Sequence, residues 1–145
     1  TGLRFFTVYG PWGRPDMAIY SFAKAIVEGQ PIDLYNEGNM YRDFTYVTDT
    51  VAGTIAALEY SCSCDLFNLG RGKQESVLRV LALLEEGLNK RAIVRYLPRE
   101  KSDPFATHAD ITKSQSLLGY NPCVSLEEGI ASFCLWFKKF YKSSK

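Results

Sequence analysis

The amino-acid sequence predicts a domain of mixed α/β class. Short runs rich in β-branched and aromatic residues alternate with stretches whose apolar residues recur every three or four positions, a pattern typical of strands between amphipathic helices. The chain has 145 residues, of which 46% are hydrophobic, and this suffices for one core without disulfides or metal. The elements are irregularly spaced and no linker divides them. We therefore expect residues 1–145 to form a single domain without the regular βαβ alternation of a complete doubly wound sheet.

The first half of the chain is expected to hold one helix among three strands. Apolar residues at helical spacing follow Asp16, which is the predicted N-cap, and Gly29 lies where a C′ glycine belongs. The turn chemistry of residues 36–39 predicts a hairpin between the second and third strands. The expected elements are a strand at 1–9, a helix at 17–29, and strands at 32–35 and 41–47.

The second half of the chain is expected to be mainly helical. Asp49 is the predicted N-cap of the first helix there, and Glu128 follows Ser125 at the spacing of a capping box. Gly119 is expected to end the short helix that precedes Ser125. The expected elements are helices at 50–60, 76–89, 111–118 and 125–141, with strands at 67–69 and 92–97.

Charge and cysteine usage narrow the possible functions. The 17 basic and 16 acidic residues leave a net charge of +1, so no field of either sign is available to bind nucleic acid or anionic lipid. No apolar run approaches the ~18 residues that a membrane span needs. The four cysteines lack metal-binding spacing and the chain has one histidine, so we expect reduced thiols, no metal site and a cytoplasmic setting.

The residues that could carry chemistry are polar side chains at strand ends and in loops. The loop GPWGRP lacks the third glycine of a dinucleotide-binding fingerprint, and the chain contains no Ser-His-Asp set and no Walker loop. Arg42 and Asp43 interrupt an otherwise apolar and aromatic strand. On spacing alone, either the two residues form an ion pair on the surface, or Arg42 is an arginine fork for a phosphate.

Four further residues each have a structural and a functional interpretation. Arg14 and His108 are either solvated side chains or contributors to a site. Thr7 either reflects β propensity or binds a ligand, and Asp103 is either turn chemistry or a ligand-binding carboxylate. The residue pattern leaves both interpretations open at each position.

Five segments follow one another in a characteristic order: LRFFTVYGPWGRPDMA, IDLYNEGNMYRDFTYV, FNLG, DPFATHADITKSQSLLGY and SLEEGI. In this order they resemble the carboxy-terminal half of the extended short-chain dehydrogenase/reductase family. Within that family they are most similar to the nucleotide-sugar epimerases, and in particular to the UDP-glucuronate 4-epimerases. The resemblance covers essentially the whole chain, and its first two motifs are long and specific.

The resemblance implies a larger enzyme built from two parts. In the family, an amino-terminal Rossmann part carries the glycine fingerprint, NAD and the catalytic Ser and Tyr-x-x-x-Lys residues, and a smaller carboxy-terminal part binds the UDP-sugar. This sequence starts just after the place of Tyr-x-x-x-Lys. We therefore expect a substrate-binding portion that lacks the amino-terminal NAD-binding domain and most of the Rossmann sheet, contains no catalytic residue and is inactive alone.

The resemblance also implies roles for individual residues. Thr7 matches a position that touches the sugar or the diphosphate, and Arg14 matches an arginine near the substrate. Arg42 matches the arginine on the diphosphate, and Asp103 matches the carboxylate on the ribose. The remaining matches are Asp16 and Met17 at the helix start under the nucleotide, Asp33, Leu34 and Tyr35 on the strand that contacts uracil, and Phe5, Phe6 and Val8 beside the nicotinamide.

The reaction that the resemblance implies is an epimerization of a UDP-sugar, with UDP-glucuronate the expected substrate. Sugar C4 is oxidised with NAD, the 4-keto sugar rotates, and its other face is reduced. The alternatives are a UDP-glucuronate decarboxylase or nucleotide-sugar dehydratase, and a non-catalytic nucleotide-sugar-binding or interaction module. Without the Rossmann half, apolar faces would lose their cover, so we expect that half to be a partner and the isolated chain to form a homo-oligomer.

Overall fold

The computed structural model describes residues 1–100 and 102–143, and these form helices packed against four small sheets of two strands each. The strands are β1 (Gly2–Phe5), β2 (Thr7–Tyr9), β3 (Pro31–Tyr35), β4 (Tyr41–Arg42), β5 (Phe44–Tyr46), β6 (Leu66–Leu69), β7 (Glu75–Ser76) and β8 (Ile93–Leu97). The helices are α1 (Ala18–Glu28), α2 (Val47–Glu59), α3 (Val77–Leu88), α4 (Thr112–Leu118) and α5 (Leu126–Ser143), with a 3-10 turn η1 (Asn36–Gly38). The mixed α/β class predicted from the sequence is confirmed.

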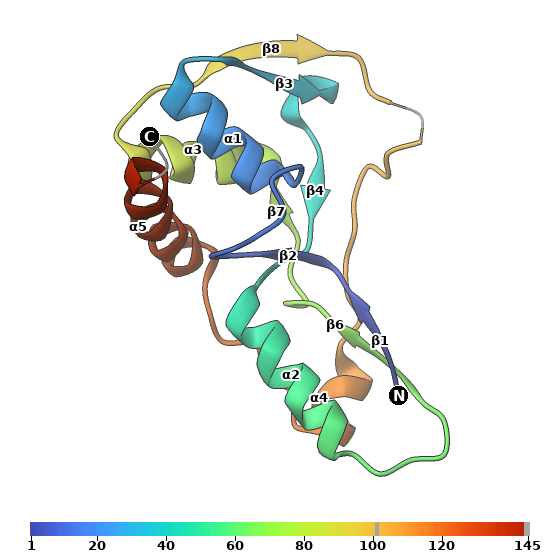
Figure 1. The fold of residues 1–145 in the computed structure, drawn as a ribbon. Coiled ribbons are helices and arrows are strands. Elements are labelled where there is room, and N and C mark those ends of the chain that lie inside the picture. The colour runs from blue at the N-terminus through green and yellow to red at the C-terminus, as the bar shows by residue number, and fades with distance from the viewer. Residues whose placement is uncertain (101, 144–145) are drawn as a thin grey trace.

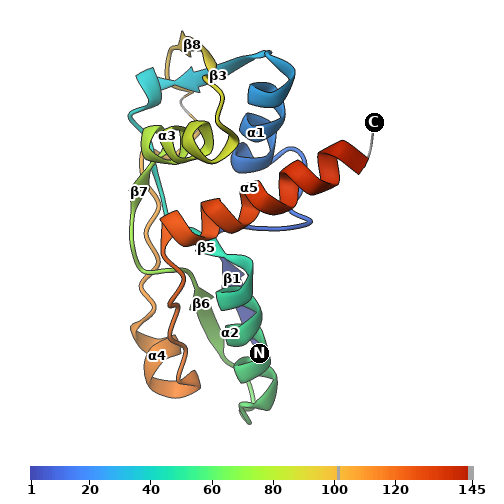
Figure 2. The same ribbon diagram turned by 90° about the vertical axis from the view of Figure 1, so that its left-hand side faces the viewer.

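Three of the four sheets are parallel, so their strands come from distant parts of the chain. β1 pairs with β6, β2 with β5, and β3 with β8, whereas β4 and β7 are antiparallel. The β3/β8 sheet and the β1/β6 sheet lie at opposite ends of the molecule, and β2 and β5 run between them (Figures 1 and 2). Each sheet is too narrow to form a domain alone, so the helices that cover the strands hold the fold together.

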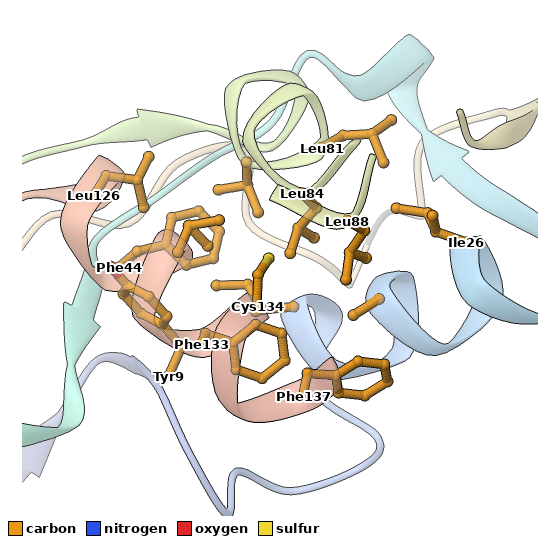
Figure 3. Close-up of a cluster of buried hydrophobic side chains, with 14 of the residues drawn as sticks. Tyr9, Ile26, Phe44, Leu81, Leu84, Leu88, Leu126, Phe133, Cys134 and Phe137 are labelled. Atoms are coloured by element: carbon orange, nitrogen blue, oxygen red, sulfur yellow. The ribbon is translucent and has the colours of Figure 1, made fainter. Parts of the chain in front are cut away.

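The main hydrophobic core lies where α1, α3 and α5 meet beneath the β3/β8 sheet (Figure 2). Ile26 of α1, Leu84 of α3, and Phe133 and Phe137 of α5 are each at most 1% exposed and point into one cluster (Figure 3). Burying side chains of this size stabilises the fold by about 2 kcal/mol each. No helix among the described residues is both long and apolar enough to span a membrane.

Most of the predicted helix ends are confirmed, because they depend on local chemistry. Gly29 and Gly119 take left-handed conformations, with φ of 68° and 64°, at the ends of α1 and α4. The hydroxyl and the amide of Ser125 both donate to Glu128 Oε2, at 2.6 and 3.0 Å, and the Glu128 amide donates to Ser125 Oγ at 3.2 Å. This reciprocal set is the predicted capping box at the start of α5.

The predicted hairpin at residues 32–47 is wrong. β3 forms a parallel ladder with β8, in which Pro31 lies opposite Ile93, and β4 pairs instead with β7. The turn residues form η1, where the Asn39 amide donates to the Asn36 carbonyl at 2.9 Å. The ladder with β8 allows Ile32 and Leu34 to be buried at 3% and 2% exposure against the helices, and this burial outweighs the local preference for a hairpin.

The predicted strand at 1–9 is interrupted near Phe6, because its two halves pair with different partners. The Phe6 amide donates to the Leu69 carbonyl at 3.4 Å, whereas the Thr7 amide donates to the Asp43 carbonyl at 3.1 Å. The predicted strand at 41–47 is likewise divided into β4 and β5, and α2 begins at Val47.

Two predicted N-caps are wrong. Met17 occupies the cap position of α1 and makes no side-chain cap bond, while the Asp16 carboxylate pairs with Arg14. α2 begins two residues before Asp49, whose side chain is buried. The Asp49 carboxylate instead accepts hydrogen bonds from the amides of Cys123 and Val124, at 3.2 and 3.1 Å, and thereby fixes the segment that leads into α5.

Candidate functional site

A cavity of about 510 Å³ opens between the amino-terminal end of α1 and strand β3. The residues around it come from α1 and β3, from the segments around β2, β4 and β5, and from the loop after β8. Of the nine residues expected to bind substrate, eight line this cavity; they are Thr7, Asp16, Met17, Asp33, Leu34, Tyr35, Arg42 and Asp103. The fold therefore brings together, in one place, residues that the sequence separates by almost a hundred positions.

Arg42 is the one cationic side chain among the lining residues that the structure describes. Its side chain is 15% exposed, and its Nη2 lies 2.5 Å from Oδ1 of Asp103. Its Nη1 donates to the backbone carbonyls of Tyr41 and Phe105, at 2.7 and 3.4 Å. The guanidinium is therefore held at the cavity wall by one carboxylate and two carbonyls, in a geometry suited to an anion.

Asp43 does not pair with Arg42, so the surface ion pair considered from the sequence is wrong. The Asp43 side chain is fully buried. Its Oδ1 accepts hydrogen bonds from the Arg71 amide at 2.7 Å and the Thr45 hydroxyl at 3.3 Å, and its Oδ2 accepts from the amides of Gly72 and Ala109, both at 3.0 Å. Asp43 is thus a structural anchor that fixes the backbone next to Arg42.

Asp33 lines the cavity on β3, and its carboxylate faces the neighbouring strand. Arg95 of β8 lies directly opposite and donates to both carboxylate oxygens, at 2.6 and 2.7 Å. The guanidinium lowers the pKa of Asp33 below its usual value, so the group is ionised at neutral pH. The side chain of Asp33 is therefore engaged in the sheet, and Asp33, Leu34 and Tyr35 together line the cavity.

Arg14 is the one predicted substrate residue that does not line the cavity. Its Nε donates to Asp16 Oδ1 at 3.0 Å, and the side chains of Arg14 and Asp16 are 75% and 63% exposed. The hydrogen bond from Arg14 lowers the pKa of Asp16. The structure thus places Arg14 as a solvated ion pair at the rim, which is the structural interpretation considered from the sequence.

The residues expected beside a nicotinamide do not line the cavity. Phe5 is 54% exposed on β1, and Phe6 and Val8 are half-buried. Among the described residues, no glycine-rich loop leads directly into a helix, so these residues form no cradle for a dinucleotide diphosphate. His108 also lies outside the cavity, where its Nε2 is 3.1 Å from the Gly72 carbonyl oxygen.

The apolar wall of the cavity was not predicted from the sequence. Ala18, Phe22 and Ala25 follow helical spacing on α1, and such a stripe indicates a core face. In the structure these three residues line the cavity, while Ile26 beside them is buried in the core. The available signal was that Ala18 and Ala25 are small and that the polar Ser21 lies beside Phe22. The other unpredicted lining residues are Pro31, Ile32, Met40, Phe44 and Val77.

Comparisons with known proteins point to one family. The NAD dependent epimerase/dehydratase family matches residues 1–70. An uncharacterised protein of Methanocaldococcus jannaschii is 49% identical over 94% of this chain and 42% of its own length. UDP-glucuronate 4-epimerase 5 of Arabidopsis thaliana is 40% identical over 100% of this chain and 37% of its own length. The chain thus spans less than half the length of these relatives.

A solved structure extends the similarity to the fold. UDP-glucuronic acid 4-epimerase from Bacillus cereus, in complex with UDP-glucuronic acid and NAD, superposes with a TM-score of 0.89 at 39% identity. The similarity covers 96% of this chain and 45% of that protein. In sequence and in fold, this chain is therefore related to the NAD dependent epimerase/dehydratase family, as a partial relative of its UDP-glucuronate 4-epimerases.

Proposed function

We propose that this chain is the part of an NAD-dependent UDP-glucuronate 4-epimerase that holds the UDP-sugar. The observation that carries the proposal is the gathering of eight expected binding residues around one cavity with Arg42 at its wall. The volume of about 510 Å³ is within the range of small-molecule sites. The relatives named UDP-glucuronate 4-epimerases support the choice of sugar.

In this proposal each wall of the cavity takes one portion of the ligand. Arg42 binds the diphosphate through its guanidinium, and the Asp103 carboxylate accepts hydrogen bonds from the ribose hydroxyls. The backbone of β3 at Asp33–Tyr35 meets the uracil edge, and the apolar wall of α1 packs against the ring. Thr7 lies where β2 reaches the cavity and contacts the sugar or diphosphate.

We place the dinucleotide and the redox step outside these residues. NAD, when bound, supplies the hydride acceptor and donor for chemistry at sugar C4. The described residues offer no cradle for the diphosphate of NAD, and none of them transfers a proton in this proposal. On this proposal the 145-residue chain binds UDP-sugar and does not turn it over.

The missing partner is the Rossmann half of the larger enzyme. Val51, Ile55 and Leu58 recur at helical spacing on α2 and are 50%, 52% and 85% exposed, and Phe5 on β1 is 54% exposed. Such a face favours an apolar partner. We also propose that the isolated chain covers this face by forming a homo-oligomer, and that it works in the cytoplasm, where its four free cysteines stay reduced.

Calorimetric titration with UDP tests the proposal. Wild-type chain is expected to bind UDP, and Arg42→Ala is expected to bind it at least about tenfold more weakly, because the charge-assisted bonds to phosphate are lost. Arg91→Ala is the matched control, since Arg91 pairs with Glu85 outside the cavity. No heat of binding to the wild-type chain would contradict the proposal.

A product assay separates the epimerase from its alternatives. The full-length protein that contains this segment should convert UDP-glucuronate into UDP-galacturonate. UDP-xylose as the product would identify a decarboxylase instead. Turnover by the 145-residue chain with added NAD would contradict the placement of the redox step in another part of the protein.

A further inference from the structure

We infer that the ion pair between Arg42 and Asp103 makes the cavity select nucleoside diphosphates against free inorganic anions. The inference rests on the proposed function, because it concerns the same cavity. It assigns to Asp103 a positioning and specificity role that acts through Arg42, in addition to any contact with ribose.

The guanidinium of Arg42 is held in place by three hydrogen-bond acceptors. Two backbone carbonyls, of Tyr41 and Phe105, hold its Nη1, and the Asp103 carboxylate holds its Nη2 at 2.5 Å. The Arg42 side chain is 15% exposed and that of Asp103 is 45% exposed. An anion that enters the cavity therefore reaches Arg42 on the edge where the more exposed Asp103 carboxylate already lies.

Two anions cannot share this edge without repulsion. A phosphate that approaches Arg42 must displace the carboxylate or accept a second negative charge within a few ångströms. Inorganic pyrophosphate has no group that could compensate the displaced carboxylate. A nucleoside diphosphate carries vicinal hydroxyls that donate hydrogen bonds to it, so the exchange leaves both Arg42 and Asp103 with partners.

The position of Asp103 in its loop allows such an exchange. Its amide donates to the Glu100 carbonyl at 3.2 Å, and its carbonyl accepts from Arg99 Nη2 at 3.1 Å, so the backbone is held in a turn. Among the described residues, Arg42 is the one hydrogen-bond partner of the carboxylate itself. Rotation of this side chain changes its partner without moving the loop.

Titration of Asp103→Asn with inorganic pyrophosphate and with uridine tests the inference. Removal of the competing carboxylate is expected to raise affinity for pyrophosphate by about tenfold, and to lower affinity for uridine by about tenfold through the lost charge-assisted bonds to its hydroxyls. The two affinities therefore move in opposite directions, which a loss of folded structure would not produce. Asp103→Ser repeats the measurement should Asp103→Asn unfold, as judged by circular dichroism.

Glu100→Gln is the matched control. Glu100 lies three residues before Asp103 on the same loop and does not line the cavity. Glu100→Gln changes the net charge of the chain by the same amount as Asp103→Asn. It is expected to alter pyrophosphate affinity by less than about twofold. A gain on Asp103→Asn that is no larger than on Glu100→Gln overturns the inference, as does no measurable pyrophosphate binding to either protein. Failure of wild type to bind UDP while Asp103→Asn gains pyrophosphate would overturn the proposed ligand alone.

Discussion

Asp43 and Ala109 are 66 residues apart in the chain, yet the Ala109 amide donates a hydrogen bond to Asp43 Oδ2 at 3.0 Å. The same buried carboxylate accepts from the amides of Arg71 and Gly72. One side chain thus joins the segment between β4 and β5, the loop after β6, and the segment that precedes α4. Because Arg42 precedes Asp43, this anchor also sets the position of the cavity's cation.

Asp43→Asn is expected to destabilise the fold by about 3 kcal/mol. Each carboxylate oxygen accepts from two donors, so the amide NH₂ of asparagine faces donors whichever way the side chain is turned. Urea unfolding followed by circular dichroism measures the loss. Asp65→Asn is the control, because Asp65 pairs with Lys113 at the surface, and it should shift the midpoint far less. Equal shifts for the two variants would contradict the anchor role.

The helix ends of this fold could be predicted from the sequence, whereas the strand partners could not. The Ser125 and Glu128 capping box and the left-handed Gly29 involve residues at most four positions apart, so local chemistry decides them. The partner of β3 is β8, more than fifty residues later. Turn residues at 36–39 indicate a reversal of the chain, but they carry no information about which strand buries Ile32 and Leu34.

The members of the candidate site could be expected from the resemblance to a family, but their mutual contacts could not. Spacing alone suggested a pair between Arg42 and its neighbour Asp43. The structure instead pairs Arg42 with Asp103, across 61 residues, and buries Asp43 among backbone amides. Adjacent residues of an extended segment point in opposite directions, so sequence neighbours of opposite charge need not meet. Arg14 shows the converse, since its partner Asp16 is two residues away.

Gly129→Ala is expected to destabilise the fold by about 2 kcal/mol, although alanine is the better helix former. A Cβ at this position of α5 would collide with the hydroxyl oxygen of Tyr9 and lie 2.8 Å from its Cζ. Tyr9 is 5% exposed and packs edge-on against Phe44 and Tyr46, so it has little room to move. Thermal unfolding of the purified variant measures the loss.

A second substitution checks the cause of that loss. Tyr9→Phe removes the atom nearest to the new methyl group, so Gly129→Ala should be less costly in this background by about 1 kcal/mol. The double-mutant cycle therefore provides its own control. An equal cost in both backgrounds would show that contact with the Tyr9 hydroxyl is not responsible.

Cys134 is expected to resist alkylation in the folded protein. Burial raises the pKa of its thiol from 9.0 to about 11, so only about 0.1% is thiolate at pH 8. Cys62, Cys64 and Cys123 are exposed. Mass spectrometry after iodoacetamide treatment at pH 8 should find label on the exposed cysteines first, and on Cys134 only after unfolding in urea. Native labelling of Cys134 at the rate of Cys62 would contradict this.

The same shift predicts a dependence of stability on pH. Folding favours the protonated thiol, since the pKa of Cys134 is higher in the folded chain. The stabilisation is complete below the unfolded pKa of 9.0 and is lost as pH rises towards about 11. Cys134→Ala removes this titration, so its free energy of unfolding should fall less between pH 9 and 10 than that of wild type. Parallel profiles would show that another group is responsible.

The exposed face of α2 is expected to drive self-association of the isolated chain. Leu58 is 85% exposed, and Ile55 and Val51 lie one and two turns before it on the same side of the helix. Sedimentation velocity at micromolar concentration should therefore detect dimers or larger species, and Leu58→Glu should shift them towards monomer by placing a charge in the contact. Leu135→Glu is the matched control, because Leu135 is 72% exposed on a different helix, α5. If the wild-type chain sediments only as a monomer, the exposed face of α2 does not drive self-association. If Leu58→Glu and Leu135→Glu shift the species equally, the contact lies elsewhere.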